Sequence, residues 1–251
     1  MMPPIRTKAL VLRATDVFES SKVVLLWTRE LGKVSALAKG ARRLKSPFQA
    51  ALDLLSECDI VLLHKTTGAL DLVTEAVLCD RFDPPRRDLS AYYSGYYIAE
   101  LLAELTHDLD PHPRLYDAAL VTLRHLGDDR FRAHRLFRFE LAILRELGLI
   151  PSLDACVHCG QAVEPASMRD LVSFGLAVGG VLCPNCRPGV PHVATLSGGT
   201  LHALRLLASP GPSWRSLVLG PVERAAVRGT LGAVISHLLG HRPRLLAYLG
   251  A

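Results

Sequence analysis

The sequence lacks the long apolar stretches of a membrane protein. Its longest apolar segment, LVSFGLAVGGVL (residues 171–182), is rich in glycine and falls short of the roughly 18 apolar residues that a membrane span needs. The opening MMPPIRTK is not followed by the apolar core of a secretory signal. We therefore expect a soluble cytoplasmic protein, whose six cysteines are reduced or metal-bound rather than paired in disulfides.

The motifs of several enzyme classes are also absent. The chain has no G-x-x-x-x-G-K-[ST] phosphate loop, no H-E-x-x-H and no H-x-E of the zinc deaminases. His237 and His241 are four residues apart on an expected helix, but Leu238 stands where such a metal motif would carry glutamate. We interpret the two as helix-end histidines. The sequence therefore predicts neither an enzyme nor a small-molecule substrate.

Acidic residues are missing from two parts of the chain. No carboxylate lies between Glu30 and Asp53, where five Lys or Arg residues occur, and residues 171–251 hold seven arginines against Glu223 alone. Residues 81–170 carry 14 acidic against 11 basic side chains, while the whole chain has a net charge of +5. An acidic middle between two basic ends indicates modules with different surfaces, and the excess of positive charge points weakly to an anionic partner.

The first acid-free window is densest in the segment LAKGARRLKS, residues 37–46. A run of charge is often only a solvated loop. Contact with phosphates is favoured here because no acid neutralises the window and because Gly40 allows a sharp turn. The basic residues of the window are Lys33, Lys39, Arg42, Arg43 and Lys45.

Aromatic residues for stacking on bases are scarce near this window. Phe18, Trp27 and Phe48 are the candidates in the first 80 residues, and Trp27 is expected in the core. Binding would then be mainly electrostatic, with little sequence selectivity and a steep dependence on salt.

Short β-branched runs dominate residues 7–79 and predict five strands. They are KALVLRA, KVVLLWT, KVSALAK, CDIVLLH and ALDLVTEAVL, with a hairpin turn expected at Gly68. Five short strands in about 75 residues favour a small closed barrel of the OB type.

From residue 89 onward the apolar spacing changes to three and four, which predicts helices. Three helices are expected over residues 89–148, with Ser90 as the first N-cap and a glycine after each of the other two. Two more are expected over residues 196–209 and 220–241, the second beginning at Pro221. The predicted fold is α+β, with an OB-type nucleic-acid-binding domain at 1–80 and a helical domain at 81–251.

Between these helices lies a cysteine-bearing insert, at about residues 153–190. It holds two C-x-x-C pairs, Cys156 with Cys159 and Cys183 with Cys186, separated by 23 residues. Four thiolates are the tetrahedral ligand set of one structural Zn²⁺ with no open position for a substrate. A redox C-x-x-C or four free cysteines are the alternatives. Cys58 and Cys79, on predicted strands, are expected to be core residues.

The whole chain resembles the RecO family of bacterial recombination mediators. GKVSALAKGARRLKSPF resembles its basic barrel signature, and FELAILRELGLIPSLDACVHCG followed by GGVLCPNC resembles the helix that leads into its zinc knuckles. TKALVLRATDVFESSKVVLLWTRELG matches its opening strands. The resemblance implies an N-terminal OB domain, a helical domain and a four-cysteine zinc motif.

The resemblance also implies a function in DNA repair and homologous recombination. RecO proteins bind single- and double-stranded DNA, anneal complementary strands, and work with RecR, often also RecF, to load RecA onto single strands covered by SSB. The DNA contacts transfer to Lys39, Arg42, Arg43 and Lys45, with Lys33 as a weaker candidate, and the expected location is the nucleoid. Two other classes stay open, namely a zinc-ribbon protein bound to RNA or the ribosome, and a scaffold for acidic protein tails.

Overall fold

The structure, a computed structural model, divides the chain into two compact units, Met1–Gly127 and Asp128–Ala251. The first unit joins the barrel with two of the helices that follow it, whereas the sequence-based domain boundary at residue 80 separates them; that boundary stays a prediction. The described residues are 3–43, 46, 48, 51–64, 70–83 and 88–249.

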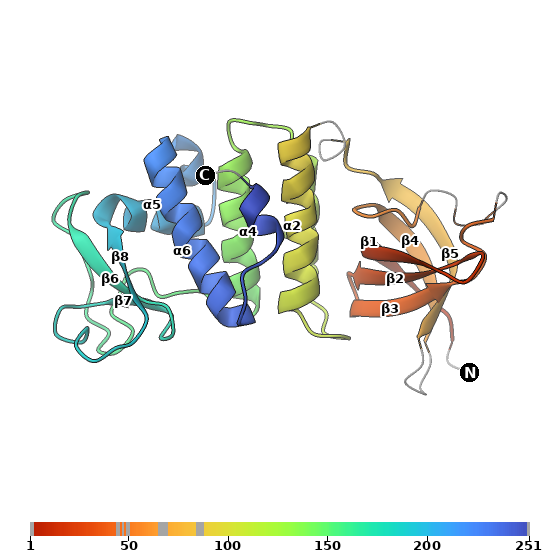
Figure 1. The fold of residues 1–251 in the computed structure, drawn as a ribbon, viewed down its shortest axis with the longest axis horizontal. Helices are drawn as coiled ribbons and strands as arrows, with labels where there is room; N and C mark the ends of the chain where they lie inside the picture. The colour runs from red at the N-terminus through yellow and green to blue at the C-terminus, as the bar shows by residue number, and fades with distance from the viewer. Residues whose placement is uncertain are drawn as a thin grey trace. The chain divides into compact units, whose positions relative to one another are not determined.

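Five strands of the first unit close into a barrel in the order β1-β2-β3-β5-β4 (Figure 1). β3 and β5 pair in parallel and all other neighbours are antiparallel. This architecture confirms the predicted barrel; the turn expected at Gly68 lies outside the described residues. The strands are β1 (Ile5–Val17), β2 (Ser21–Thr28), β3 (Gly32–Ala38), β4 (Glu57–Leu63) and β5 (Asp71–Asp80).

The barrel interior explains where the cysteines and aromatics of this unit lie. Cys58 and Phe48 belong to the buried cluster inside the barrel, at 0% and 2% exposure. Trp27 is fully buried, as predicted, and stacks on the ring of His112. Cys79 corrects a prediction: it lies on β5 but is exposed, because alternate residues near the end of that strand face solvent.

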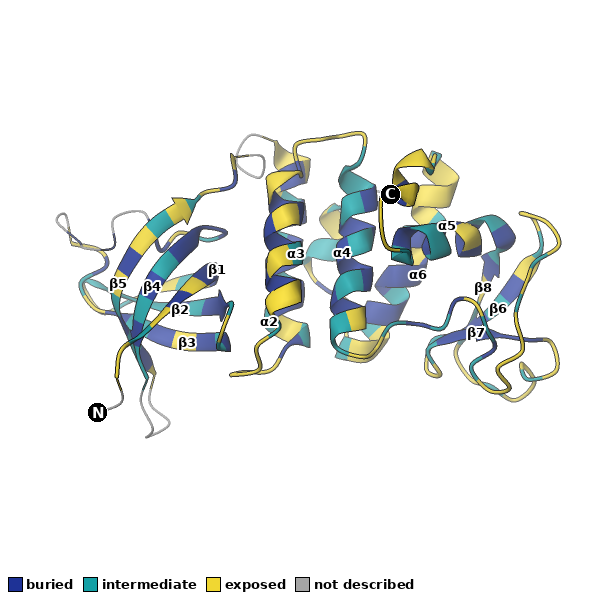
Figure 2. Cartoon of the chain, turned by 180° about the vertical axis from the view of Figure 1, so that it is seen from behind, coloured by how far each residue is buried: buried dark blue, intermediate teal, exposed yellow. Residues whose placement is uncertain are grey.

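Two helices complete the first unit, α2 (Leu89–Leu105) and α3 (Pro113–Arg124). α2 packs against β1 and β2. Its N-cap is Asp88 rather than the expected Ser90, because the Asp88 carboxylate accepts hydrogen bonds from two amides of the first turn. α3 carries separate buried and exposed stripes (Figure 2), and it ends at Arg124, before Gly127 can serve as its C-terminal glycine.

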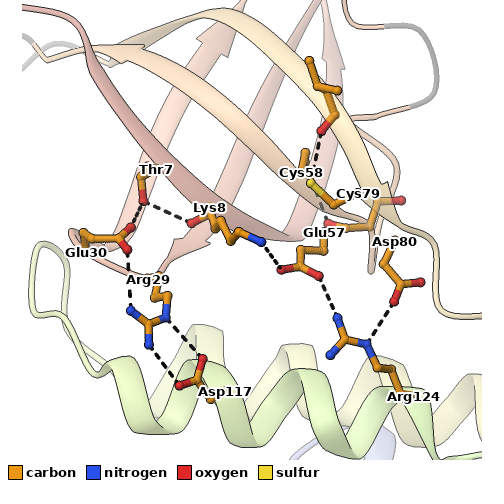
Figure 3. A network of polar contacts seen from close by, with 12 residues as sticks. Thr7, Lys8, Arg29, Glu30, Glu57, Cys58, Cys79, Asp80, Asp117 and Arg124 are labelled. Carbon is orange, nitrogen blue, oxygen red and sulfur yellow. Dashed lines mark hydrogen bonds and ion pairs between the residues drawn. The ribbon is translucent and has the colours of Figure 1, made fainter.

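Arginine–carboxylate pairs connect α3 to the barrel (Figure 3). Arg29, after β2, makes two hydrogen bonds of 3.2 and 3.1 Å to Asp117. Arg124 donates to Glu57 and Asp80, each at 3.1 Å. Burial raises the pKa of Glu57, while the positive charges of Lys8 and Arg124 oppose that shift. These bridges orient α3 on the barrel.

The second unit combines three helices with a small sheet that the sequence did not predict (Figure 1). The sheet has the order β7-β6-β8 and is antiparallel throughout. Across the described residues, no helix combines the length and apolarity needed to cross a membrane. The elements are α4 (Arg132–Glu146), β6 (Leu171–Gly175), β7 (Gly180–Leu182), β8 (Val193–Ser197), α5 (Gly198–Ala208) and α6 (Pro221–Leu239), with short 3₁₀ turns at Ser213–Ser216 and Leu245–Tyr248.

Glycine and proline residues mark helix boundaries in this unit, as expected. Gly148 follows α4 with φ +71°, and Pro221 is the first residue of α6. α6 ends at Leu239 because Gly240 adopts the left-handed conformation. His241 therefore lies beyond the helix, which corrects the expectation that it shares a helix with His237.

Arginines hold the helices of the second unit together. Arg138 of α4 donates to the carbonyls of Leu207 and Ser209 at the end of α5, at 2.7 and 2.9 Å. Arg228 of α6 pairs with Glu140, a fully buried residue of α4. Carbonyls at a helix end have no partner within the helix, so these guanidinium groups satisfy groups that burial would otherwise penalise.

Candidate nucleic-acid interface and metal centre

The basic segment predicted to contact phosphates begins where β3 ends. After Ala38 the chain turns at Gly40, which has φ +73°, and the amide of Arg43 donates to the Gly40 carbonyl at 3.1 Å. Lys39, Arg42 and Arg43 are all exposed. The structure therefore presents three of the five predicted residues to solvent from one turn.

A second turn, between β1 and β2, lies beside the first. The amide of Arg42 donates to the Ser20 carbonyl at 3.0 Å, and its guanidinium reaches the Phe18 carbonyl at 3.5 Å. Asp16 pairs with Arg42 at 3.3 Å and with Lys22 at 3.4 Å. We call residues 16–22 and 39–43 together the basic corner.

The basic corner keeps a positive balance despite its acids. Four cations, Lys22, Lys39, Arg42 and Arg43, stand against two carboxylates, Asp16 and Glu19, a net charge of +2. Asp16 and Arg42 are exposed and Lys22 is partly exposed, so solvent screens these pairs and a phosphate can compete for the same cations. Sequence reasoning missed Lys22, which comes to this place because it lies opposite Ala38 in the β2–β3 register.

The other two predicted contacts do not join the basic corner. Lys33 has a side chain only 12% exposed. Its ammonium donates to the carbonyls of Ala103 and Thr106, at 2.8 and 2.6 Å, and pairs with Asp108 at 3.5 Å. Lys33 thus caps the C-terminus of α2, and its contact with DNA stays a prediction. Lys45 lies outside the described residues.

The three candidate stacking aromatics differ sharply in exposure. Trp27 and Phe48 are buried in the unit's core, whereas Phe18 is 84% exposed on the turn beside Arg42. From the sequence the three residues were candidates because all belong to the same strand-rich region. Their different exposure is set by the fold.

The four cysteines of the second unit form one cluster, as the spacing predicted. Their sulfur atoms all lie within 4.8 Å of one another, and the sulfurs of Cys159 and Cys183 are 3.7 Å apart. Tetrahedral zinc bound at about 2.3 Å places its sulfurs about 3.8 Å apart, so these residues fit such an ion. Cys156 and Cys183 are buried, whereas Cys159 is exposed, which leaves a side for the metal to enter.

The chemistry of the thiols suits a divalent cation. Hydrogen bonds from the amides of Cys183 and Cys159 lower the pKa of Cys156 to about 6. Hydrogen bonds with the sulfurs of Cys183 and Cys159 raise the pKa of Cys186 to about 12. The thiol of Cys156 therefore ionises readily, whereas that of Cys186 stays protonated. A bound cation would offset the repulsion between the thiolates and so favour ionisation of both.

The β6–β7 hairpin brings the two cysteine pairs together. The amide of Ser152 donates to the Gly179 carbonyl at 2.9 Å, and the amide of Val157 donates to the Val181 carbonyl at 3.0 Å. A side chain at Gly180 would approach the Ser152 carbonyl oxygen to 2.5 Å. The backbone of the hairpin therefore packs closely against the backbone around Cys156 and Cys159. The second cysteine pair, Cys183 and Cys186, follows directly after the hairpin in the chain.

Arg205 of α5 holds the other side of the first cysteine pair. Its guanidinium donates to the Leu153 and Val163 carbonyls at 3.0 and 2.6 Å, and it pairs with Asp154 and Glu164. These partners flank the segment that carries Cys156 and Cys159. No local motif marks Arg205, so the sequence alone did not point to it.

Comparison with known proteins relates both parts of the chain to one family. Residues 1–82 match the family model for the N-terminal part of recombination protein O, and residues 86–247 match the model for its C-terminal part. A DNA repair protein RecO of Rhodopirellula baltica is 40% identical and aligns over 96% of this chain and 97% of its own length. That of Anaeromyxobacter sp. strain K is 36% identical over 96% and 94%.

A more distant relative from Bacillus pumilus, also named DNA repair protein RecO, is 32% identical over 80% of this chain and 76% of its own. The barrel, the helices and the four-cysteine cluster agree with what the resemblance to this family implied. Both family models and these relatives lead to one conclusion: the chain belongs to the RecO family of DNA repair proteins.

Proposed function

We propose that this chain binds single- and double-stranded DNA through its barrel and anneals complementary strands. The observation that carries the proposal is the basic corner, an exposed cluster of cations on a barrel of the OB type. OB folds that bind single strands track the nucleic-acid backbone with positively charged side chains. Family membership favours this function over the RNA-bound and scaffold alternatives.

Annealing follows from charge neutralisation in this proposal. Two DNA strands repel each other through their phosphates, and cations that contact both strands lower that repulsion. No ATP is needed, and the sequence holds no phosphate loop to bind it. We accordingly propose a binding protein rather than an enzyme, acting at the nucleoid.

The remainder of the chain is proposed to serve protein partners. With RecR, and with RecF where it takes part, the chain would help to load RecA onto single strands covered by SSB. Zn²⁺ held by Cys156, Cys159, Cys183 and Cys186 would cross-link the insert that contains them. The residues that orient these cysteines, Arg205 among them, would then maintain the conformation of the insert as a surface for partners.

The test is DNA binding across a salt titration, with labelled single-stranded and duplex oligonucleotides. Replacing Lys39, Arg42 and Arg43 by glutamate should weaken binding to both. It should also lower the slope of log affinity against log salt by about two for the single strand, since each phosphate contact contributes about 0.7. A second variant adds Lys45→Glu.

A matched control reverses three exposed arginines elsewhere, namely Arg6, Arg114 and Arg169, and so removes the same net charge. It should retain most of the affinity and annealing. If both variants bind alike, the DNA surface is not the basic corner, and the arginine-rich residues 171–251 become the next place to look. Absence of DNA binding by the unaltered chain would overturn the proposed function.

A further inference from the structure

Phe18 is an apolar ring that the fold leaves outside its core. The residue is 84% exposed on a three-residue hairpin loop, because Val17 pairs with Ser21 across the turn. Its φ is +52°, a conformation that bulky L-residues rarely adopt. Backbone strain of this kind persists where the surrounding structure holds it, and it is often found at functional positions.

An isolated exposed phenylalanine is unremarkable by itself, but Phe18 is not isolated. The guanidinium of Arg42 reaches its carbonyl oxygen, and Asp16 holds that guanidinium from the other side. The basic corner is therefore a ring and a set of exposed cations on two turns that are hydrogen-bonded to each other. An aromatic face next to cations is the combination with which proteins hold single-stranded nucleic acid.

We propose that Phe18 stacks on a base of single-stranded DNA while the cations beside it contact the flanking phosphates. The inference rests on the proposed function and adds strand selectivity to it. Bases of a duplex are already stacked on their neighbours, so the ring favours the single strand and adds little to duplex binding. The cations contact phosphates in either form.

Stacking also suits a protein that anneals strands. The ring of Phe18 contacts the face of a base and leaves the hydrogen-bonding edge of that base free. A strand held in this way can still pair with its complement. A protein that hydrogen-bonded to the edges of the bases would have to release those edges before pairing. Phe18 thus contributes to holding the strand without blocking its pairing.

The first experiment compares Phe18→Ala, Phe18→Leu and Phe18→Trp with the unaltered full-length chain. The probes are a labelled oligothymidylate and a labelled duplex of the same length. Loss of one stacked base should weaken single-strand binding by about five-fold or more, up to roughly a hundred-fold, in the Ala and Leu variants. Duplex binding and the salt slope should stay unchanged, because no charge is removed.

Phe18→Trp supplies a direct readout and a rescue. It should retain single-strand binding, and oligothymidylate should quench the emission of the new indole as it stacks. The natural Trp27 and Trp214 are buried at 0% and 6% exposure, so their emission in the unaltered chain is the background to subtract. Equal thermal midpoints in all variants are expected, since the replaced ring makes no core contact.

The outcomes separate this inference from the function on which it rests. If Phe18→Ala binds the single strand as well as the unaltered chain, or if its single-strand and duplex affinities fall together, the stacking role is wrong while DNA binding stands. An unquenched Phe18→Trp also overturns it. If the unaltered chain binds neither probe, the proposed function and the stacking role fail together.

Discussion

Single residues of the basic window take different roles according to where their side chains lie. Lys33 and Lys39 are six positions apart and look alike in the sequence, yet one lies between a strand and a helix end while the other is exposed. Lys33 also binds the loop after α2 through its backbone, because the Leu109 amide donates to its carbonyl at 3.0 Å. Charge alone therefore does not assign function within this window.

The two lysines allow a paired prediction. Lys33→Met should lower the free energy of unfolding of the first unit by about 1–3 kcal/mol, since partly buried carbonyls at the end of α2 lose their donor. Lys39→Met should change it by less than about 0.5 kcal/mol. Urea unfolding can be followed by Trp27 emission in chains that carry Trp214→Phe.

DNA binding should show the reverse order. Lys39→Met should lower the salt slope for single strands by about 0.7, and Lys33→Met should leave that slope unchanged at temperatures where the variant is folded. A lower slope for Lys33→Met, with stability intact, would show instead that Lys33 contacts phosphates and that its place at the end of α2 is secondary.

At the scale of elements, the β6–β7 hairpin decides whether four cysteines make one site. The two strands pack apolar side chains into the core of the second unit, and close backbone contacts place the end of this strand pair. Gly175 and Gly180 face each other at the end of this pair, and Gly180 also bridges to Ser152. The apolar cluster around Cys156, Leu182 and Cys183 is small, so these backbone contacts matter to the geometry of the site.

Gly180, the first residue of β7, and Gly179, the last residue of the turn before it, provide a matched test. In Gly180→Ala the new Cβ would lie 2.5 Å from the Ser152 oxygen and 2.7 Å from Cγ1 of Val157, so the hairpin must move away from the first cysteine pair. We expect zinc affinity to fall by about ten-fold or more, as when other groups that orient metal ligands are lost. Competition with a chromophoric chelator measures the change.

Gly179→Ala is the control. Gly179 has φ +73°, and a Cβ there would meet nothing within 4 Å, so the variant carries only the local cost of a left-handed alanine, about 1–2 kcal/mol. Its zinc affinity should stay close to that of the unaltered chain. Equal losses in the two variants would show that turn strain, rather than contact with Ser152, governs the site.

For the whole molecule, the division into two compact units predicts that DNA binding and metal binding can be lost independently of each other. Each unit has its own buried cluster, one inside the barrel and one among α4, α5, α6 and the sheet of β6, β7 and β8. The proposed DNA contacts belong to the first unit and the cysteine cluster to the second. Damage to the cysteine cluster should therefore leave the proposed DNA binding by the barrel intact.

Metal removal tests this separation. The purified chain should contain one equivalent of zinc, and its removal with a chelator should make residues 153–190 more sensitive to protease, because a small loop-rich segment relies on its metal for order. Single-strand binding should be retained within about two-fold. A chain that loses zinc and DNA binding together would contradict the separation.

Much of this structure follows from local sequence. The five barrel strands, the helix that begins at Pro221 and the glycine after α4 were all predictable, because alternation and turn chemistry depend on residues only a few positions apart. The cysteine cluster was predictable as well, since two C-x-x-C pairs supply the four thiolates of one tetrahedral metal site whatever the path between them.

Contacts between distant segments were decided only by the tertiary structure. Lys33 finds its carbonyl partners 70 and 73 positions away, and Arg42 lies beside Phe18, which is 24 positions away. Sheet register and helix packing set these pairings, and neither leaves a periodic signal in the chain. Local conformational preferences depend on residues that are neighbours in the sequence. A buried side chain or a polar group, in contrast, can be covered or hydrogen-bonded by any segment that the fold places opposite it. The partner of such a side chain is therefore determined only by the tertiary structure.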